Sequence, residues 1–263
     1  MLELRQRSAR DRTQSYFVEG VRFVVTASDA DETFRSLVIA PKLLRTPLAQ
    51  MLARRLPASG VPTLSVSPDE FARVSQAEEP SGIGAVLAQR WRPLRSVVLK
   101  HDDCWIALSD VRSPGNLGTL LRTAAAARAR GVIVLAGGSA DPFQPGTVRA
   151  AMGAMTSLSF VSATPAEFQD WRRRTRVAVL GATPQAAVDY RAVSYRQPVV
   201  LLLGSERKGL SEAQLALCDS RVRIPMSGGD SLNLAVAGSV LLYEVWNQRH
   251  PLHDGRAVGA DSR

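Results

Sequence analysis

The second half of this 263-residue chain alternates short aliphatic runs with longer helix-forming runs. The aliphatic runs predict five buried strands, at Trp105–Ser109, Val132–Leu135, Arg176–Leu180, Val199–Leu203 and Arg221–Ile224. The runs that follow them favour helices at Gly118–Arg130, Thr147–Met155, Pro165–Arg174, Ser211–Leu217 and Leu232–Gln248. Strands and helices that alternate in this way typically form a parallel sheet with helices on both faces. The sequence therefore predicts an α/β fold of that kind.

The first 95 residues have a different pattern, which predicts a small α/β domain of its own. Short strands are expected at Tyr16–Gly20, Leu37–Ala40 and Thr63–Val66, and helices at Gly20–Ser28, Pro41–Arg55 and Pro68–Val74. The basic segment Gln89–Pro93 is expected to be a linker. We thus expect a first domain over residues 1–95, a second over 96–250 and a flexible tail over 251–263, which lacks apolar periodicity.

The charge composition suggests a polyanionic partner without establishing one. The chain carries 33 Lys and Arg against 24 Asp and Glu, a formal net charge of +9. Arginine supplies all of the basic side chains except Lys42, Lys100 and Lys208, and genomic base composition can also produce such a bias. Nucleic-acid binding and simple solubility both remain open on this ground.

The two cysteines indicate neither a disulfide framework nor a metal site. Cys104 and Cys218 stand alone in separate predicted elements, as small buried thiols of a reducing cytosol do. No apolar run is long enough to span a bilayer, and Met1–Arg12 lacks the apolar region of a signal peptide. We therefore expect a cytoplasmic protein with no metal and no membrane span.

The familiar phosphate-binding motifs fail in this sequence. Gly82-Ile83-Gly84 begins a dinucleotide fingerprint, but Leu87 occupies the third glycine position and no strand is expected before it. The segment 204–209 has the outer glycines of a P-loop, yet Leu210 follows where that motif needs lysine. The GxSxG and HExxH motifs are absent as well. A dehydrogenase, a P-loop NTPase and a serine hydrolase are all disfavoured.

Three polar, glycine-rich loops follow predicted strands, at Asp110–Gly118, Gly204–Ser211 and Ile224–Asn233. The carboxyl ends of parallel strands are where open α/β sheets bind ligands. In the first loop, we expect Asn116 to cap a helix whose free N–H groups suit an anionic oxygen. In the third loop, Ser231 is the expected cap. Each loop alone could be an ordinary connection, but three together favour a ligand site.

Four segments within these loops and helices occur in a fixed order between residues 105 and 248. They read SDVRSPGNLGTLLRTAAA, RAAMGAM, LLLGSERKGLS and RIPMSGGDSLNLAVAGSVLLYE. In them the chain resembles the SpoU/TrmH branch of the SPOUT RNA methyltransferases. Residues 17–21 and 81–86 are similar to the ribosomal-protein-like substrate-binding domain that many members carry.

The resemblance implies both a fold and a reaction. The C-terminal part of the parallel sheet would be threaded into a trefoil knot, a topology nearly absent from proteins. The reaction would transfer a methyl group from S-adenosyl-L-methionine to a ribose 2′-hydroxyl, in a homodimer and on ribosomal RNA rather than tRNA. A tRNA substrate, an inactive RNA-binding factor on the same fold and a nucleotide-dependent α/β transferase are the alternatives.

The resemblance also assigns residues by motif position. The cofactor would be held at Gly204, Ile224, Met226 and Leu232, where Gly204 would let the backbone approach it closely. The polar positions around the ribose are Asn116, Arg122, Glu206, Ser231 and Asn233. Arg122 would grip a phosphate with two hydrogen bonds and stabilise the developing alkoxide, and Glu206 would order its loop or an arginine. Ala151 and Ala235 stand where the family usually has serine.

Overall fold

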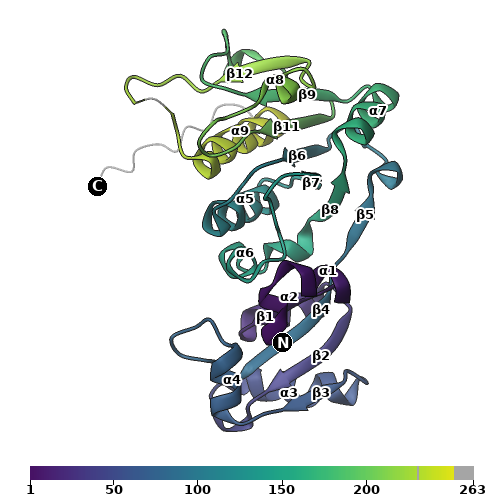
Figure 1. Ribbon diagram of the computed structural model, residues 1–263, viewed down its shortest axis with the longest axis vertical. Helices are drawn as coiled ribbons and strands as arrows, with labels where there is room; N and C mark the ends of the chain where they lie inside the picture. The colour runs from purple at the N-terminus through teal and green to yellow at the C-terminus, as the bar shows by residue number, and fades with distance from the viewer. Residues whose placement is uncertain (230, 252–263) are drawn as a thin grey trace, which may run out of the picture.

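The computed structural model describes residues 1–229 and 231–251, so the tail predicted over 251–263 lies outside the described residues from residue 252 on. Within the described residues the chain forms a sheet of eight strands and a sheet of four. The eight-stranded sheet (the large sheet) occupies the upper lobe in Figure 1 and the four-stranded sheet (the small sheet) the lower one.

The large sheet is parallel at every described strand pair, which confirms the predicted parallel α/β fold. Its order is β10-β12-β9-β11-β6-β7-β8-β5. The strands are β5 (Trp91–Pro93), β6 (Cys104–Leu108), β7 (Gly131–Leu135), β8 (Ser159–Ala163), β9 (Ala178–Ala182), β10 (Val188–Asp189), β11 (Val199–Leu203) and β12 (Ser220–Arg223). β6, β7 and β11 are buried at every position, as expected of aliphatic strands covered on both faces.

Helices cover both faces of the large sheet, as predicted. On one face Ile106, Val132 and Leu201 pack against α5 (Pro114–Ala126), α6 (Pro145–Ala151) and α9 (Leu234–Arg249). On the other face Trp105 and Ile133, whose side chains alternate with the first set, pack against α7 (Pro165–Thr175) and α8 (Glu212–Leu215). The two-residue period of a strand therefore divides the core into two layers.

The small sheet has the order β1-β4-β2-β3, in which β2 and β3 are parallel and the other pairs antiparallel. Its strands are β1 (Ser15–Glu19), β2 (Phe34–Ile39), β3 (Thr63–Ser65) and β4 (Ile83–Ala88). The helices around it are α1 (Arg7–Thr13), α2 (Val21–Asp29), α3 (Pro47–Ala58) and α4 (Pro68–Val74). Single 3-10 turns form at Leu2–Arg5, Pro41–Leu43, Leu94–Ser96, Ala154–Ser157 and Tyr190–Ala192.

Two predictions for the first half of the chain were wrong. The segment Gln89–Pro93 is not a linker throughout, because Trp91–Pro93 forms β5 and pairs with β8. The Trp91 ring packs edge-on against Phe143 and Phe160, which fixes this short strand. The helix predicted at Pro41–Arg55 is broken after Leu43, and α3 starts afresh at Pro47 because the Thr46 side chain accepts a hydrogen bond from the Ala49 N–H.

A buried ion pair joins the two lobes. Arg10 of α1 donates a hydrogen bond to Asp141, which lies in the loop after β7; the two side chains are 2% and 14% exposed. The same guanidinium donates to the carbonyl oxygens of Leu4 and Arg5, at 2.8 and 2.9 Å. Asp141 in turn accepts a hydrogen bond from the Phe143 N–H at 3.1 Å. The pair thus fixes the chain start of one lobe to a loop of the other.

Substituting Arg10→Met should lower the free energy of unfolding by about 3–5 kcal/mol, because Asp141 would keep a buried charge without its partner. Urea unfolding followed by circular dichroism measures this change. Arg12→Met is the matched control, since its ion pair with Glu3 is exposed (66% and 77%) and should contribute no more than about 1 kcal/mol. Equal losses for the two variants would show that the buried pair has no special role.

Candidate active site

A cavity of about 650 Å³ opens at the carboxyl edge of the large sheet, beyond β9, β11 and β12. Its walls include the residues predicted to hold a cofactor, Gly204, Ile224, Met226 and Leu232. Glu206 and Ser231, predicted as polar site residues, also line it. The cavity volume falls within the range typical of small-molecule sites, and its place is the edge at which parallel sheets bind ligands.

The loop after β11 is a tight hairpin held by its own backbone. The Ser205 N–H donates to the Gly209 carbonyl at 2.9 Å and the Gly209 N–H to the Ser205 carbonyl at 3.0 Å. Gly209 has φ +64°, a left-handed conformation that favours glycine. A Cβ atom on Gly204 would lie 2.1 Å from the carbonyl carbon of Gly209. Gly204 is therefore required by close approach within the loop itself, whereas the sequence had suggested approach to a ligand.

The Glu206 carboxylate connects this second loop to the first. It accepts hydrogen bonds from the Asn116 side-chain amide at 2.5 Å, from the Arg112 N–H at 3.2 Å and from the Ser113 N–H at 3.2 Å. The Asn233 side-chain amide then donates to Asn116 Oδ1 at 3.0 Å. One chain of side chains, Glu206–Asn116–Asn233, thus links all three glycine-rich loops.

The helix caps at this edge differ from the predicted ones. α5 is capped by Ser113, whose hydroxyl accepts from the Asn116 N–H at 3.3 Å, and Pro114 occupies the first helical position that proline favours. α9 is capped by Asn233, whose Oδ1 accepts from the Ala235 and Val236 N–H groups at 2.8 and 3.3 Å. Asn116 and Ser231 are therefore not caps. This leaves the Asn116 side chain free for the network.

The first loop is also held from its other side. Ser139 donates to the carboxylate of Asp110, and this hydrogen bond lowers the pKa of Asp110 below its usual range. The Arg112 guanidinium, 3.5 Å from Asp110, acts in the same direction. Asp110 is therefore ionised at neutral pH. Ser139 belongs to the same loop as Asp141, so the contacts run from the buried Arg10 to the first site loop.

Asn116 and Asn233 do not line the cavity themselves but are joined to its wall through Glu206. Among the described residues, Arg122 is the predicted site residue that neither lines the cavity nor belongs to this network. It lies exposed on α5 and is not among the lining residues. No acceptor for its guanidinium is found among residues 1–229 and 231–251. Its neighbour Thr123 accepts a hydrogen bond from Ser239 of α9 at 3.0 Å, which places Arg122 beside the surface that α5 and α9 share.

Several cavity residues were missed from the sequence. Thr183, Pro184 and Gln185 follow β9 and line the cavity. The strand there was predicted at Arg176–Leu180 but lies at Ala178–Ala182, so the shift concealed which residues reach the carboxyl edge. Ala151 and Ala235, which stand where serine was expected, are 0% and 3% exposed, so a hydroxyl at either position would need a buried partner.

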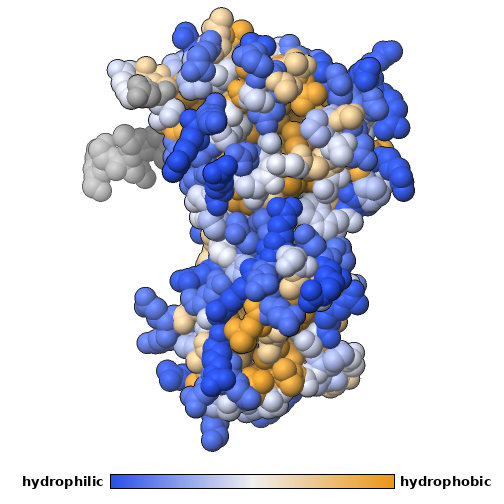
Figure 2. Space-filling view, in the orientation of Figure 1, coloured by the Kyte–Doolittle hydropathy of each residue, from blue (hydrophilic) through white to orange (hydrophobic). Residues whose placement is uncertain are grey.

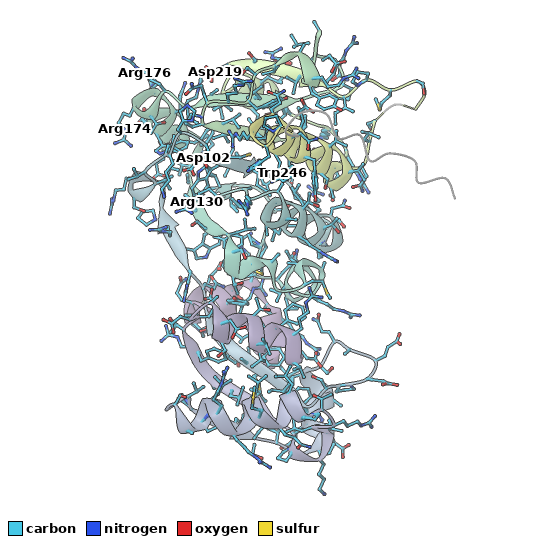
Figure 3. The ribbon with its side chains drawn as sticks, turned by 180° about the vertical axis from the view of Figure 1, so that it is seen from behind. Asp102, Arg130, Arg174, Arg176, Asp219 and Trp246 are labelled. Carbon is cyan, nitrogen blue, oxygen red and sulfur yellow. The ribbon has the colours of Figure 1, made fainter. Side chains whose placement is uncertain are left out.

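Charged side chains also gather at the opposite edge of the large sheet, where the amino ends of the strands lie. Figure 3 shows Asp102 and Arg130 near the amino ends of β6 and β7, and Arg174 and Arg176 at the end of α7. Asp219 lies there too; it pairs with Arg172 and accepts from the Val179 N–H at 2.8 Å. These carboxylate contacts fix secondary structure. The described cavity at the carboxyl edge remains the candidate site.

Burial raises the pKa of the Cys218 thiol to about 11 and that of Cys104 to about 12, so both are protonated at neutral pH. Within residues 1–229 and 231–251 no three His, Cys, Asp or Glu side chains are placed to hold a metal ion together. No helix in the same ranges has the length and hydropathy of a membrane span.

Both halves of the chain match known sequence families. Residues 103–243 match the SpoU rRNA Methylase family, and residues 1–85 match the MRM3-like substrate binding domain. The first match covers all three loops and the cavity between them.

Similar proteins cover nearly the whole chain. The 23S rRNA (uridine(2479)-2′-O)-methyltransferase of Streptomyces viridochromogenes is 32% identical over 254 residues, which are 94% of this chain and 87% of that protein. The 23S rRNA (guanosine(2553)-2′-O)-methyltransferase of Bacillus subtilis is 27% identical, over 92% and 93%. The crystal structure of an AdoMet-bound rRNA methyltransferase from Sinorhizobium meliloti has a TM-score of 0.85 at 35% identity, over 95% and 93%.

Replacing Glu206 tests whether it orders the first loop. In Glu206→Ala the N–H groups of Arg112 and Ser113 lose their acceptor, which costs about 1–3 kcal/mol for a buried group and less for these half-exposed ones. Their amide hydrogen exchange should therefore accelerate, by at least about fivefold. Glu206→Gln keeps an acceptor oxygen and should retain most of the protection. Unchanged exchange in Glu206→Ala would contradict the role given to this carboxylate.

Proposed function

The chain belongs to the SpoU rRNA methylase family, and on that premise we propose that it transfers a methyl group from S-adenosyl-L-methionine to a ribose 2′-hydroxyl of large-subunit ribosomal RNA. One observation carries the proposal: the three motif loops meet at one sheet edge, joined through Glu206, Asn116 and Asn233, around a cavity of ligand size. The two curated relatives named above are 23S rRNA enzymes, which supports ribosomal RNA over tRNA.

The cavity residues suit this cofactor. Leu203, Ile224, Met226 and Leu232 offer apolar surface for an adenine ring, and the backbone of the loop after Gly204 offers polar groups. We propose that Gly204, Ile224, Met226 and Leu232 hold S-adenosyl-L-methionine, which would supply an electrophilic methyl group. The apolar walls would also exclude water from the reacting ribose oxygen.

The polar residues divide the remaining work. Asn116 and Asn233 already spend one amide hydrogen each on the network, and each keeps a second one for the ribose. Ser231 lines the cavity and presents an exposed hydroxyl. Arg122 cannot act as the base, because a guanidinium only donates hydrogen bonds and has no lone pair to accept a proton. Its role would be to grip the neighbouring phosphate and stabilise the forming alkoxide, while a phosphate oxygen relays the proton.

We propose that the enzyme is a homodimer formed through α9. Val236 and Tyr243 are 49% and 48% exposed, and their spacing of seven places them on one face of the helix. Leu232, which is 38% exposed, lies just before the helix begins. Trp246, labelled in Figure 3, lies one turn beyond, and its ring contacts Tyr243. This apolar face adjoins Arg122. Dimerisation there would bring Arg122 to the cavity of the partner subunit.

We further propose the division of labour and the topology that the family implies. Residues 1–95 would bind RNA and residues 96–250 would carry the reaction, in the cytoplasm. The C-terminal segment would be threaded as a trefoil knot. The segment after β12 supports this, because it contributes Ile224, Met226 and Leu232 to the same cavity as the β11 loop before α9 packs on α5.

The reaction can be tested with purified protein, methyl-labelled S-adenosyl-L-methionine and protein-free large-subunit ribosomal RNA. We expect label in RNA, at a linkage that resists alkaline cleavage because its 2′-hydroxyl is blocked. Label on a base would contradict the assigned reaction. RNA binding without any transfer would favour the alternative of an inactive RNA-binding factor.

Substitution of Gly204 tests the cofactor site. Gly204→Ala should open the Ser205–Gly209 hairpin, because the added Cβ has no room beside Gly209. We expect S-adenosyl-L-methionine affinity, measured by calorimetry, to fall at least about tenfold. Gly115→Ala is the control: its Cβ would meet only the Ser113 hydroxyl, at 3.8 Å. Unchanged affinity in Gly204→Ala would remove this loop from the cofactor site.

Mixed dimers test the place of Arg122. Arg122→Ala should lower the methylation rate by about 100- to 1000-fold. Arg122→Lys should lose nearly as much, since it lacks the planar fork. Gly204→Ala should have little activity when the cofactor concentration lies well below the Kd of this variant. If Arg122 serves the partner's cavity, a dimer of one Arg122→Ala and one Gly204→Ala subunit has one complete site, and mixing should restore activity. Absence of restoration in purified mixed dimers would show that Arg122 acts within its own subunit, or not at all.

A further inference from the structure

A second cavity, of about 240 Å³, lies where the small sheet meets α6. Its floor is apolar and includes the rings of Phe17 and Phe23 together with Val74, Val148 and Met152. Figure 2 shows an apolar patch bordered by hydrophilic side chains on the lower lobe, where Figure 1 places the chain start and α4. We call this space the junction cavity. The site described above does not use it.

The walls of the junction cavity are held by hydrogen bonds, so the space exists before any ligand arrives. Glu19 accepts from the Ser75 hydroxyl and from the Gln76 N–H at 2.9 Å. Arg149 donates to the Gln76 carbonyl at 2.6 Å. On the opposite side, Met1, Leu4 and Arg5 form the wall. The buried Arg10 guanidinium donates hydrogen bonds to the carbonyls of Leu4 and Arg5 and so fixes this segment.

Two arginines and two glutamates line the junction cavity, Arg5 and Arg149 with Glu19 and Glu79, so its charge is balanced and the arginines are the groups that a phosphate would contact. Arg5 and Arg149 line it and are exposed. Each uses part of its guanidinium on backbone carbonyls, Arg5 on that of Arg73 at 2.9 Å, and keeps further N–H groups for a phosphate. The Glu19 carboxylate is occupied by its two donors. An aromatic and aliphatic floor with a guanidinium rim is the combination that binds unstacked nucleobases and their phosphates.

Its position relates the junction cavity to the first site loop. Pro145, the first residue of α6, lines the cavity. The next residue, Gly146, lies against Pro114, the first residue of α5: a Cβ on Gly146 would be 2.8 Å from the Pro114 side chain. The junction cavity and the Ser113–Asn116 turn therefore lie on two sides of the same helix start. One RNA strand could contact both.

We propose that the junction cavity receives an unpaired nucleobase of the substrate RNA, with the adjoining phosphate held by Arg5 and Arg149. The inference rests on the proposed function and deepens it. An RNA would be selected by an unstacked nucleotide near the methylated ribose, in addition to the contacts of the ribose itself. Base-paired RNA cannot present such a nucleotide without opening.

Methionine methyl groups offer direct reporters in the full-length protein. Met1 and Met152 line the junction cavity, Met226 lines the cofactor cavity, and Met51 is exposed on α3 as a control. With methyl-¹³C methionine, we expect at least one of the four ribonucleoside 5′-monophosphates to shift the Met152 and Met1 signals. S-adenosyl-L-methionine should shift Met226 instead. Inorganic phosphate should leave Met152 unchanged.

A second test fills the junction cavity with a large side chain. Ala77 is exposed and lines the junction cavity, so Ala77→Trp should occupy it; Ala72→Trp, on the exposed side of α4, is the matched control. Base stacking accounts for about 5- to 150-fold in affinity, so Ala77→Trp should raise the KM for RNA within that range and abolish the Met152 shift. Arg149→Ala should lower the slope of log affinity for RNA against log salt concentration by about one. The control Arg54→Ala, on α3 and outside the cavity lining, should leave this slope unchanged.

Each result decides the proposal. A Met152 signal that no nucleotide shifts, or that inorganic phosphate shifts equally, would overturn it, as would a wild-type KM in Ala77→Trp. If the wild-type protein transfers no methyl group to RNA, the proposed function fails. The nucleotide response at Met152 would still decide the cavity by itself, so the two failures are distinguishable.

Discussion

Parallel pairing is the constraint on which this molecule depends. It places the carboxyl ends of all the central strands at one edge, and the loops that leave this edge carry backbone N–H groups with no strand beside them. The Glu206 carboxylate supplies acceptors for two of these groups and for Asn116, and Asn116 passes the contact to Asn233. Three loops from distant parts of the sequence thereby become one site. A fold with antiparallel strands would divide the same loops between two edges.

Hydrophobic periodicity and local residue chemistry were enough to predict the central strands and the loops that follow them. β11 was located to the residue, and the three loops were identified as one edge because aliphatic runs leave few alternatives. The caps were assigned wrongly: Ser113 and Asn233 cap the helices, although Asn116 and Ser231 satisfy the same residue preference. The preference of Ser and Asn for N-cap positions cannot identify the cap when two such residues lie close together. The position of Pro114 and the hydrogen-bond network between the loops determine which of them caps the helix. β4 and β8 were missed because Gly84 and two serines interrupt their aliphatic pattern, and pairing with neighbours compensates for that.

The position of Arg122 shows a different limit. The resemblance assigns it to the chemistry, yet in the structure it lies on the surface beside α9. Local sequence can identify a residue type and its helix, but it does not show which groups lie near an exposed guanidinium. The same reasoning applies to the Arg10–Asp141 pair, whose members are far apart in sequence and carry no motif. Such contacts become visible only when the lobes are placed together.

The connection between the lobes has a consequence for target choice. The chain leaves the small sheet at the end of β4 and, after Gln89 and Arg90, forms β5, which pairs with β8 in the large sheet, as Figure 1 shows. Trp91 of β5 packs against both Phe143 and Phe160. A flexible tether would let the lobes search independently and accept targets of many shapes. A paired strand instead sets the separation of the two lobes in the protein. If both lobes contact RNA, as proposed, an RNA whose contact points have another separation would engage one lobe or the other, but not both, so the molecule would discriminate between targets by length as well as by chemistry.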